Sequence, residues 1–125
     1  MHFLGLAAAL VAALAHVSFF ALESVLFMRP TTYGRFGLRS AADAAIARPW
    51  AFNQGFYNLF LAVGAAGGVV AVLAGQATVG RTLVFFACGC MVLAGVVLVA
   101  TDRHFVRAGL LQVVPPLLVF ASLAL

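Results

Sequence analysis

Apolar residues fill four long runs of this 125-residue chain, and shorter polar stretches separate the runs. The runs cover about residues 3–28, 50–74, 79–100 and 105–125. Each run is roughly 20 residues or longer, which is enough to cross about 30 Å of hydrocarbon at about 1.5 Å of rise per helical residue. Because the bilayer interior offers the backbone no water, such segments must satisfy their own hydrogen bonds as helices. The pattern therefore predicts four transmembrane helices.

The later connections predict how these helices are arranged. Residues 75–80 and 101–104 form short links, so the helices that they join must run antiparallel. Asp102 is placed to cap the last helix. We expect residues 1–125 to form a single all-α integral membrane domain, an up-down four-helix transmembrane bundle.

The first connection is the only long one. Ser40 and Asp43 have the spacing of a capping box, and Pro49 follows nine residues after Ser40. We expect a short interfacial helix over about 41–48, with Trp50 as an aromatic anchor at the level of the lipid headgroups.

Composition narrows the class of protein further. The chain is 66% hydrophobic and 8% charged, and its mean hydropathy is +1.18. Soluble domains have roughly half apolar and about a quarter charged residues, so soluble enzymes, disordered chains and disulfide scaffolds are excluded. Cys88 and Cys90 point about 200° apart on a helix, which makes them packing residues rather than a redox or metal pair.

The net charge of +4 comes from seven arginines against three acids. Four of the arginines lie between Arg29 and Arg48, where loop contacts with anionic lipid explain them better than nucleic-acid binding does. The first-loop arginines lie on the same side as Arg103 and Arg107, six in all, whereas the opposite side carries Arg81 and the amino terminus. This bias predicts cytoplasmic loops one and three, and both termini outside.

Polar side chains inside apolar spans are costly and usually face the bundle interior, so they are the best functional candidates. Seven such residues are present: His16, Glu23, Asn53, Gln54, Tyr57, Asn58 and Gln112. Most of them lie at a similar depth in the cytoplasmic half, with His16 near the midplane. We expect a polar pocket near the cytoplasmic side that binds a small molecule or ion. A single interior histidine and a single acid make a weak donor set for a transition metal, and we assign no metal site.

Two helices show further features around this pocket. One side of the second-span helix carries four polar residues and two glycines, so it must face protein: Asn53, Gln54, Tyr57, Asn58, Gly64 and Gly68. In the last span, Pro115 and Pro116 remove two backbone donors and free carbonyls beside Gln112, which favours a kink and adds acceptors.

Glu23, the run Asn53-Gln54-Gly55-Phe56-Tyr57-Asn58 and the run Gln112-Val113-Val114-Pro115 resemble the pattern of a known family. It consists of small bacterial four-span membrane proteins and is catalogued as domain of unknown function 1304. Glycine is frequent after the last-span glutamine in that pattern, whereas this chain has Val113, which leaves less room against the last helix. The resemblance implies a four-span fold in a bacterial inner membrane and brings no activity or cofactor.

Three functional hypotheses follow from the residues. The first is binding and translocation of a small solute or ion, linked to protonation of Glu23. The second is a membrane enzyme acting on a lipid or quinone-like substrate, with Glu23 or His16 as general acid or base, although no catalytic motif is present. The third is a structural or accessory subunit that packs against other spans. A homodimer is compatible with all three, because four short spans enclose little volume.

Overall fold

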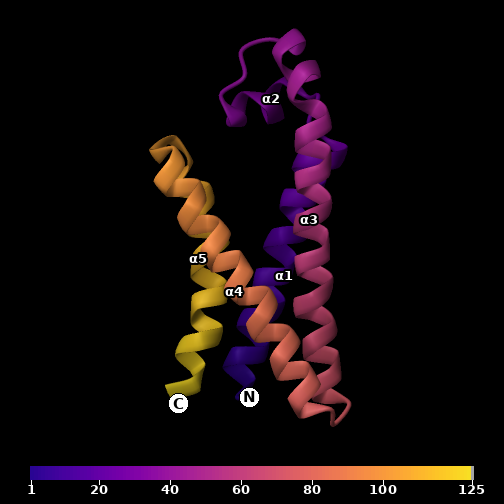
Figure 1. Cartoon of the computed structure of the whole chain (residues 1–125), viewed down its shortest axis with the longest axis vertical. Coiled ribbons are helices and arrows are strands. Elements are labelled where there is room, and N and C mark those ends of the chain that lie inside the picture. The colour runs from indigo at the N-terminus through magenta and orange to yellow at the C-terminus, as the bar shows by residue number, and fades with distance from the viewer. Residues whose placement is uncertain (125) are drawn as a thin grey trace. The chain divides into compact units, whose positions relative to one another are not determined.

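The computed structural model describes residues 1–124, which are almost entirely helical (Figure 1). The elements are, in order, α1 (Phe3–Phe20), a π-helical turn η1 (Ala21–Val25), α2 (Pro30–Tyr33), a 3₁₀ turn η2 (Gly34–Phe36), α3 (Ala41–Leu73), α4 (Ala77–Thr101), a 3₁₀ turn η3 (Arg103–Phe105), α5 (Val106–Ala121) and a last 3₁₀ turn η4 (Ser122–Ala124). Four helical segments are long and apolar enough to cross a membrane: Phe3–Val25, Ala41–Leu73, Ala77–Thr101 and Arg103–Ala124. The predicted all-α membrane fold is confirmed.

The chain divides into two compact units. The first, here called the bundle unit, contains Met1–His16 and the described residues from Leu61 onward. The second, here called the loop unit, contains Val17–Phe60. Helices α1 and α3 run through both units.

The bundle unit has parts of α1, α3, α4 and α5 around one apolar core. Its helices alternate in direction, and the beginning of α1 and the end of α5 lie at the same end of the unit (Figure 1). Small side chains dominate this core and let the helix backbones approach closely. The core residues are Ala9, Ala12, Ala13, Ala62, Ala65, Val69, Val84, Ala87, Cys88, Met91 and Val119.

Glycine sets the closest approach between α3 and α4. A methyl group at Gly68 would lie 2.8 Å from the carbonyl oxygen of Gly80, and one at Gly80 would lie 2.5 Å from the carbonyl oxygen of Gly68. Only hydrogen fits at either position without moving the helices apart. The predicted packing role of the Gly64/Gly68 face is seen here, since Gly64 also lies opposite Ala87.

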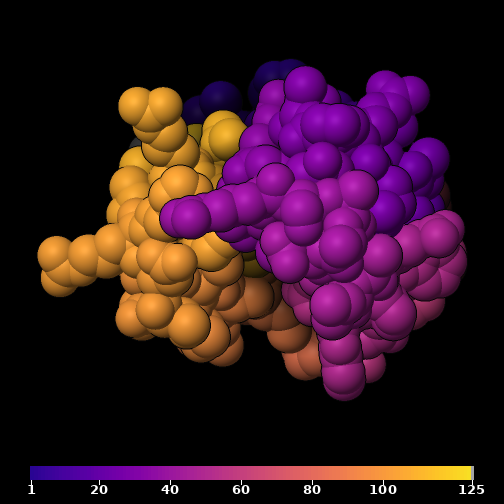
Figure 2. Space-filling view, turned by 90° about the horizontal axis from the view of Figure 1, so that it is seen from above, coloured from indigo at the N-terminus to yellow at the C-terminus, as the bar shows by residue number. Residues whose placement is uncertain are grey.

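The loop unit combines the end of α1, the π-helical turn, α2, η2 and the first part of α3. Seen end-on, the segment between α1 and α3 and the first turns of α3 form one continuous surface (violet to magenta, Figure 2). Ser40 caps α3 as expected, because its hydroxyl accepts the backbone N–H of Asp43 at 3.1 Å and donates to the Asp43 carboxylate at 2.7 Å.

The first loop differs from expectation in one respect. Its short helix is α2, whereas residues 41–48 are the start of α3, which continues through Pro49 to Leu73. Proline removes a single backbone hydrogen bond, and the alanine-rich residues before it favour the helix enough to keep it continuous.

Candidate functional site

Glu23 and Asn58 meet across two helices of the loop unit. The Asn58 side-chain amide donates a 2.7 Å hydrogen bond to Oε2 of Glu23, and the same nitrogen lies 3.3 Å from the carbonyl oxygen of Gln54. Asn58 is 6% exposed, so its amide points into protein and not toward lipid. The partner of the carboxylate is thus an amide, not one of the arginines.

The π-helical turn displays Glu23. The Leu26 N–H bonds to the carbonyl oxygen of Ala21, one residue further back than in an α-helix. An extra residue in one turn rotates the following side chains relative to the α1 face before it, and such turns are frequent at functional sites. Glu23 lies in the middle of this turn.

A glycine on α3 lets the turn come close. A methyl group at Gly55 would collide with Oγ of Ser24 and would lie 3.1 Å from Cβ of Glu23. The Ser24 hydroxyl also donates a 2.9 Å hydrogen bond to the Phe52 carbonyl oxygen of α3. This crossing fixes the height at which Glu23 meets Asn58.

Beside this contact the loop unit has a groove of about 430 Å³, here called the Glu23 groove. Three of the predicted polar residues line it together with apolar and aromatic side chains. Its lining residues are Glu23, Phe27, Phe36, Leu38, Ala47, Trp50, Ala51, Asn53 and Gln54. The Phe27 and Phe36 rings lie 5.4 Å apart and form part of one wall. A carboxylate thus shares one cavity with three aromatic rings.

Charge around the groove is unevenly distributed. Glu23 is the only charged residue that lines it, within the part of the chain that the structure describes. The arginines of the first loop are all exposed and do not line the groove: Arg29, Arg35, Arg39 and Arg48. Among the described residues, the cavity is therefore in direct contact with a single charged side chain, which is acidic.

The remaining predicted site residues lie elsewhere. Tyr57 is 58% exposed, and its ring lies 6.4 Å from that of Phe60. His16 belongs to the bundle unit, where it is fully buried and its Nδ1 lies 2.9 Å from the Ala12 carbonyl oxygen. Gln112 belongs to the same unit and donates a 3.4 Å hydrogen bond to the Met91 carbonyl oxygen of α4. Within residues 1–124, no three His, Cys, Asp or Glu side chains are grouped as metal ligands.

Sequence reasoning missed the apolar half of the groove. Phe27 falls in a predicted span and Trp50 is the predicted anchor, whereas Phe36 lies in the first connection with no predicted role, although all three line the same cavity as Glu23. Gly55 was part of the recognised motif, but its packing role was not inferred. The aromatic residues that recur on both sides of the first loop were the sequence feature that could have indicated this apolar wall.

These features define a multi-pass membrane protein with a small, partly polar groove. The model of the family described as "Protein of unknown function (DUF1304)" matches residues 10–124, so the chain belongs to that family. Comparisons with curated proteins and with solved structures found no match.

Proposed function

We propose that this membrane protein binds a small organic cation in the Glu23 groove. The observation that carries the proposal is the composition of the groove, in which one carboxylate faces a cavity walled by Phe27, Phe36 and Trp50. Aromatic faces attract cations, and tryptophan does so most strongly. A carboxylate supplies the opposite charge, while the apolar walls receive the hydrocarbon part of the ligand.

The hydrogen bond from Asn58 supports this function. It uses Oε2 of Glu23 and holds the carboxyl group in one orientation, so that Oε1 remains for the ligand. Asn53 and Gln54 are exposed at the same groove and can bond to polar substituents on the ligand. The amides therefore orient the ligand, and Glu23 supplies the charge.

The second part of the proposal is proton-linked translocation of the cation. A proton on Glu23 removes the negative charge that holds the ligand, so proton and cation compete for one carboxylate. The arginines of the first loop, Arg103 and Arg107 favour a cytoplasmic position for the first and third loops, with both termini outside. We place the protein in a bacterial inner membrane as part of this proposal.

Binding of radiolabelled benzyltrimethylammonium to the purified protein in detergent tests the first part. Glu23→Gln keeps an acceptor for the Asn58 amide and removes only the charge. This cation has no N–H donor, so the lost interaction is a charge–charge contact, which is worth about 1 kcal/mol in water and about 4 kcal/mol near a protein surface at about 4 Å. A loss of roughly 2 kcal/mol should weaken binding about 30-fold. Asp43→Asn, which removes an exposed carboxylate of the same unit outside the groove, should leave binding unchanged.

Three results would separate the alternatives. The wild-type affinity should fall as the pH is lowered, and excess neopentylbenzene, the neutral analogue of the same shape, should not compete. Equal binding by wild type and Glu23→Gln would refute the cation site and leave a structural subunit as the better hypothesis. If the cation binds but proteoliposomes with an acidic interior take up no more of it than liposomes without protein, translocation is refuted and binding stands.

A further inference from the structure

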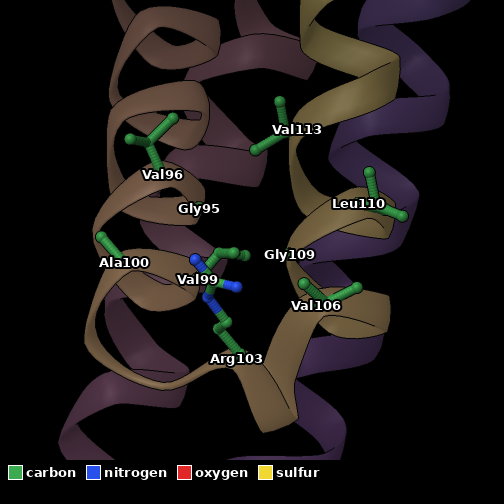
Figure 3. A pocket seen from close by; sticks show the side chains of 9 residues that line it. All are labelled: Gly95, Val96, Val99, Ala100, Arg103, Val106, Gly109, Leu110 and Val113. Carbon is green, nitrogen blue, oxygen red and sulfur yellow. The ribbon is translucent and has the colours of Figure 1, made fainter.

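A second groove lies in the bundle unit, between α4 and α5, and its composition differs from that of the Glu23 groove. Its volume is about 490 Å³. Apart from Arg103, every residue lining it is glycine or an aliphatic residue: Gly95, Val96, Val99, Ala100, Val106, Gly109, Leu110 and Val113. Figure 3 shows Val99 and Val113 between the two helices, whereas Ala100 and Leu110 lie toward their outer sides.

Two glycines set the floor of this groove. A methyl group at Gly95 would lie 3.5 Å from the carbonyl oxygen of Gly109, and one at Gly109 would lie 3.5 Å from that of Gly95. Each glycine faces a valine of the other helix, because a methyl group at Gly95 would collide with Cγ2 of Val113 and one at Gly109 with Cγ2 of Val99. From Gly95 to Ala100 the groove follows about 7.5 Å of α4, at about 1.5 Å per residue, and Arg103 of η3 lies beyond its last turn.

The groove opens on the outside of two helices that are apolar enough to span a membrane. Val96 is 55% exposed and Leu110 is 56% exposed, so no part of the described chain covers these walls. In a bilayer, the molecules that surround such a surface are lipids. An aliphatic groove of this kind matches an acyl chain in chemistry.

Arg103 adds a positive charge at the end of the groove. Figure 3 shows its side chain extending back along α4, with the nitrogen atoms beside Val99. The neighbouring carboxylate of Asp102 accepts the backbone N–H of His104 at 2.8 Å as a cap. Arg103 is exposed in the connection between the two spans, so its guanidinium can meet lipid headgroups at the membrane surface. Its planar donors suit phosphate oxygens.

We propose that this groove binds an anionic glycerophospholipid, with one acyl chain along the Gly95/Gly109 crossing and the phosphodiester on Arg103. The groove combines aliphatic walls along its length with a single cation at one end, which is the arrangement of an anionic lipid. Free phosphate would use only the Arg103 end, and a lipid with a cationic headgroup would bring a second positive charge next to the guanidinium.

Native mass spectrometry of the purified full chain tests this proposal, with phosphatidylglycerol as the probe and phosphatidylcholine for comparison. The wild type should retain phosphatidylglycerol in preference to phosphatidylcholine, and inorganic phosphate should not displace it. Arg103→Gln should weaken phosphatidylglycerol binding about tenfold, which is the loss expected for a charge-assisted hydrogen bond. Arg107→Gln is the matched control, because Arg107 is a nearby arginine that does not line the groove.

A substitution that fills the groove is a second test of the proposal. Val106→Phe adds volume at an exposed lining position, and it should weaken lipid binding while the far-ultraviolet circular dichroism and elution volume stay those of the wild type. Equal losses in Arg103→Gln and Arg107→Gln would show general surface attraction and would overturn the proposal. Unchanged binding in both Arg103→Gln and Val106→Phe would overturn it as well.

Discussion

The hydrogen bond between Glu23 and Asn58 gives a direct test of how the π-helical turn is held against α3. Alanine at either position removes the bond, and alanine at both removes it only once. The coupling free energy of this double-mutant cycle therefore isolates the bond from everything else that each residue does. The full cycle is needed, and not a single substitution, because Asn58 also contacts the carbonyl oxygen of Gln54 within its own helix.

The expected coupling follows from the geometry. Hydrogen bonds to charged groups contribute about 1.5–3 kcal/mol in water-soluble proteins, whereas interhelical bonds in a membrane protein average about 0.6 kcal/mol and reach about 1.7 kcal/mol. The bond is short, at 2.7 Å, and Asn58 is 6% exposed. Both facts favour the upper part of the membrane range, and we expect about 1.5 kcal/mol.

Reversible unfolding in mixed micelles, followed by circular dichroism and by fluorescence of the single tryptophan, measures each corner of the cycle. A matched control cycle pairs Glu23 with Asn53, an exposed amide of the same helix. No bond between Asn53 and Glu23 is seen among the described residues, so the coupling of this cycle should be near zero. A Glu23/Asn58 coupling as small as that of the Asn53 cycle would refute the reasoning. The contact would then contribute nothing to the stability of the loop unit.

Two further substitutions test the packing of α3. Gly68→Val should lower the free energy of unfolding by about 1–3 kcal/mol, because its Cβ would lie 2.8 Å from the Gly80 carbonyl oxygen. Gly67→Val is the control and should not lower it, because nothing lies within 4 Å of a Cβ at Gly67; equal losses would argue against the α3–α4 contact. Pro49→Ala should raise the free energy of unfolding by roughly 1–3 kcal/mol, because it restores the backbone donor that α3 lacks. A decrease in the same micelle unfolding experiment would show instead that the proline favours the native helix.

The membrane helices could be predicted from the sequence because length and hydropathy alone determine them. The capping roles of Ser40 and Asp102 were also predictable, since each depends on residues within three positions. The continuity of α3 through Pro49 was not predicted. It depends on a balance between one lost hydrogen bond and the helix preference of the alanines before it, and pattern alone does not weigh that balance.

The site was only partly predictable for a different reason. Depth along two spans predicted that Glu23 and Asn58 lie in the same half of the bundle, and the structure joins them across 35 positions of sequence. The π-helical turn has no single-residue signature, so the side-chain directions after Ala21 could not be computed from a regular helical period. Phe36 and Leu38 enter the Glu23 groove from the connecting segment, whose path depends on packing that no periodicity describes.

The length of α3 connects these irregular features to the proposed function. Its 33 residues extend about 50 Å, which exceeds the roughly 30 Å of a hydrocarbon core, so its beginning must lie outside the acyl chains. With Leu73 at the far boundary, about 20 residues bring the near boundary to the Gln54 region. The α3 wall of the Glu23 groove, Ala47 to Gln54, then lies among the headgroups. Organic cations with an apolar part concentrate at this level, because the charge stays near water while the hydrocarbon reaches the acyl chains. A groove at this level would suit the proposed ligand. A regular α-helical end of α1 would not turn Glu23 in the same direction.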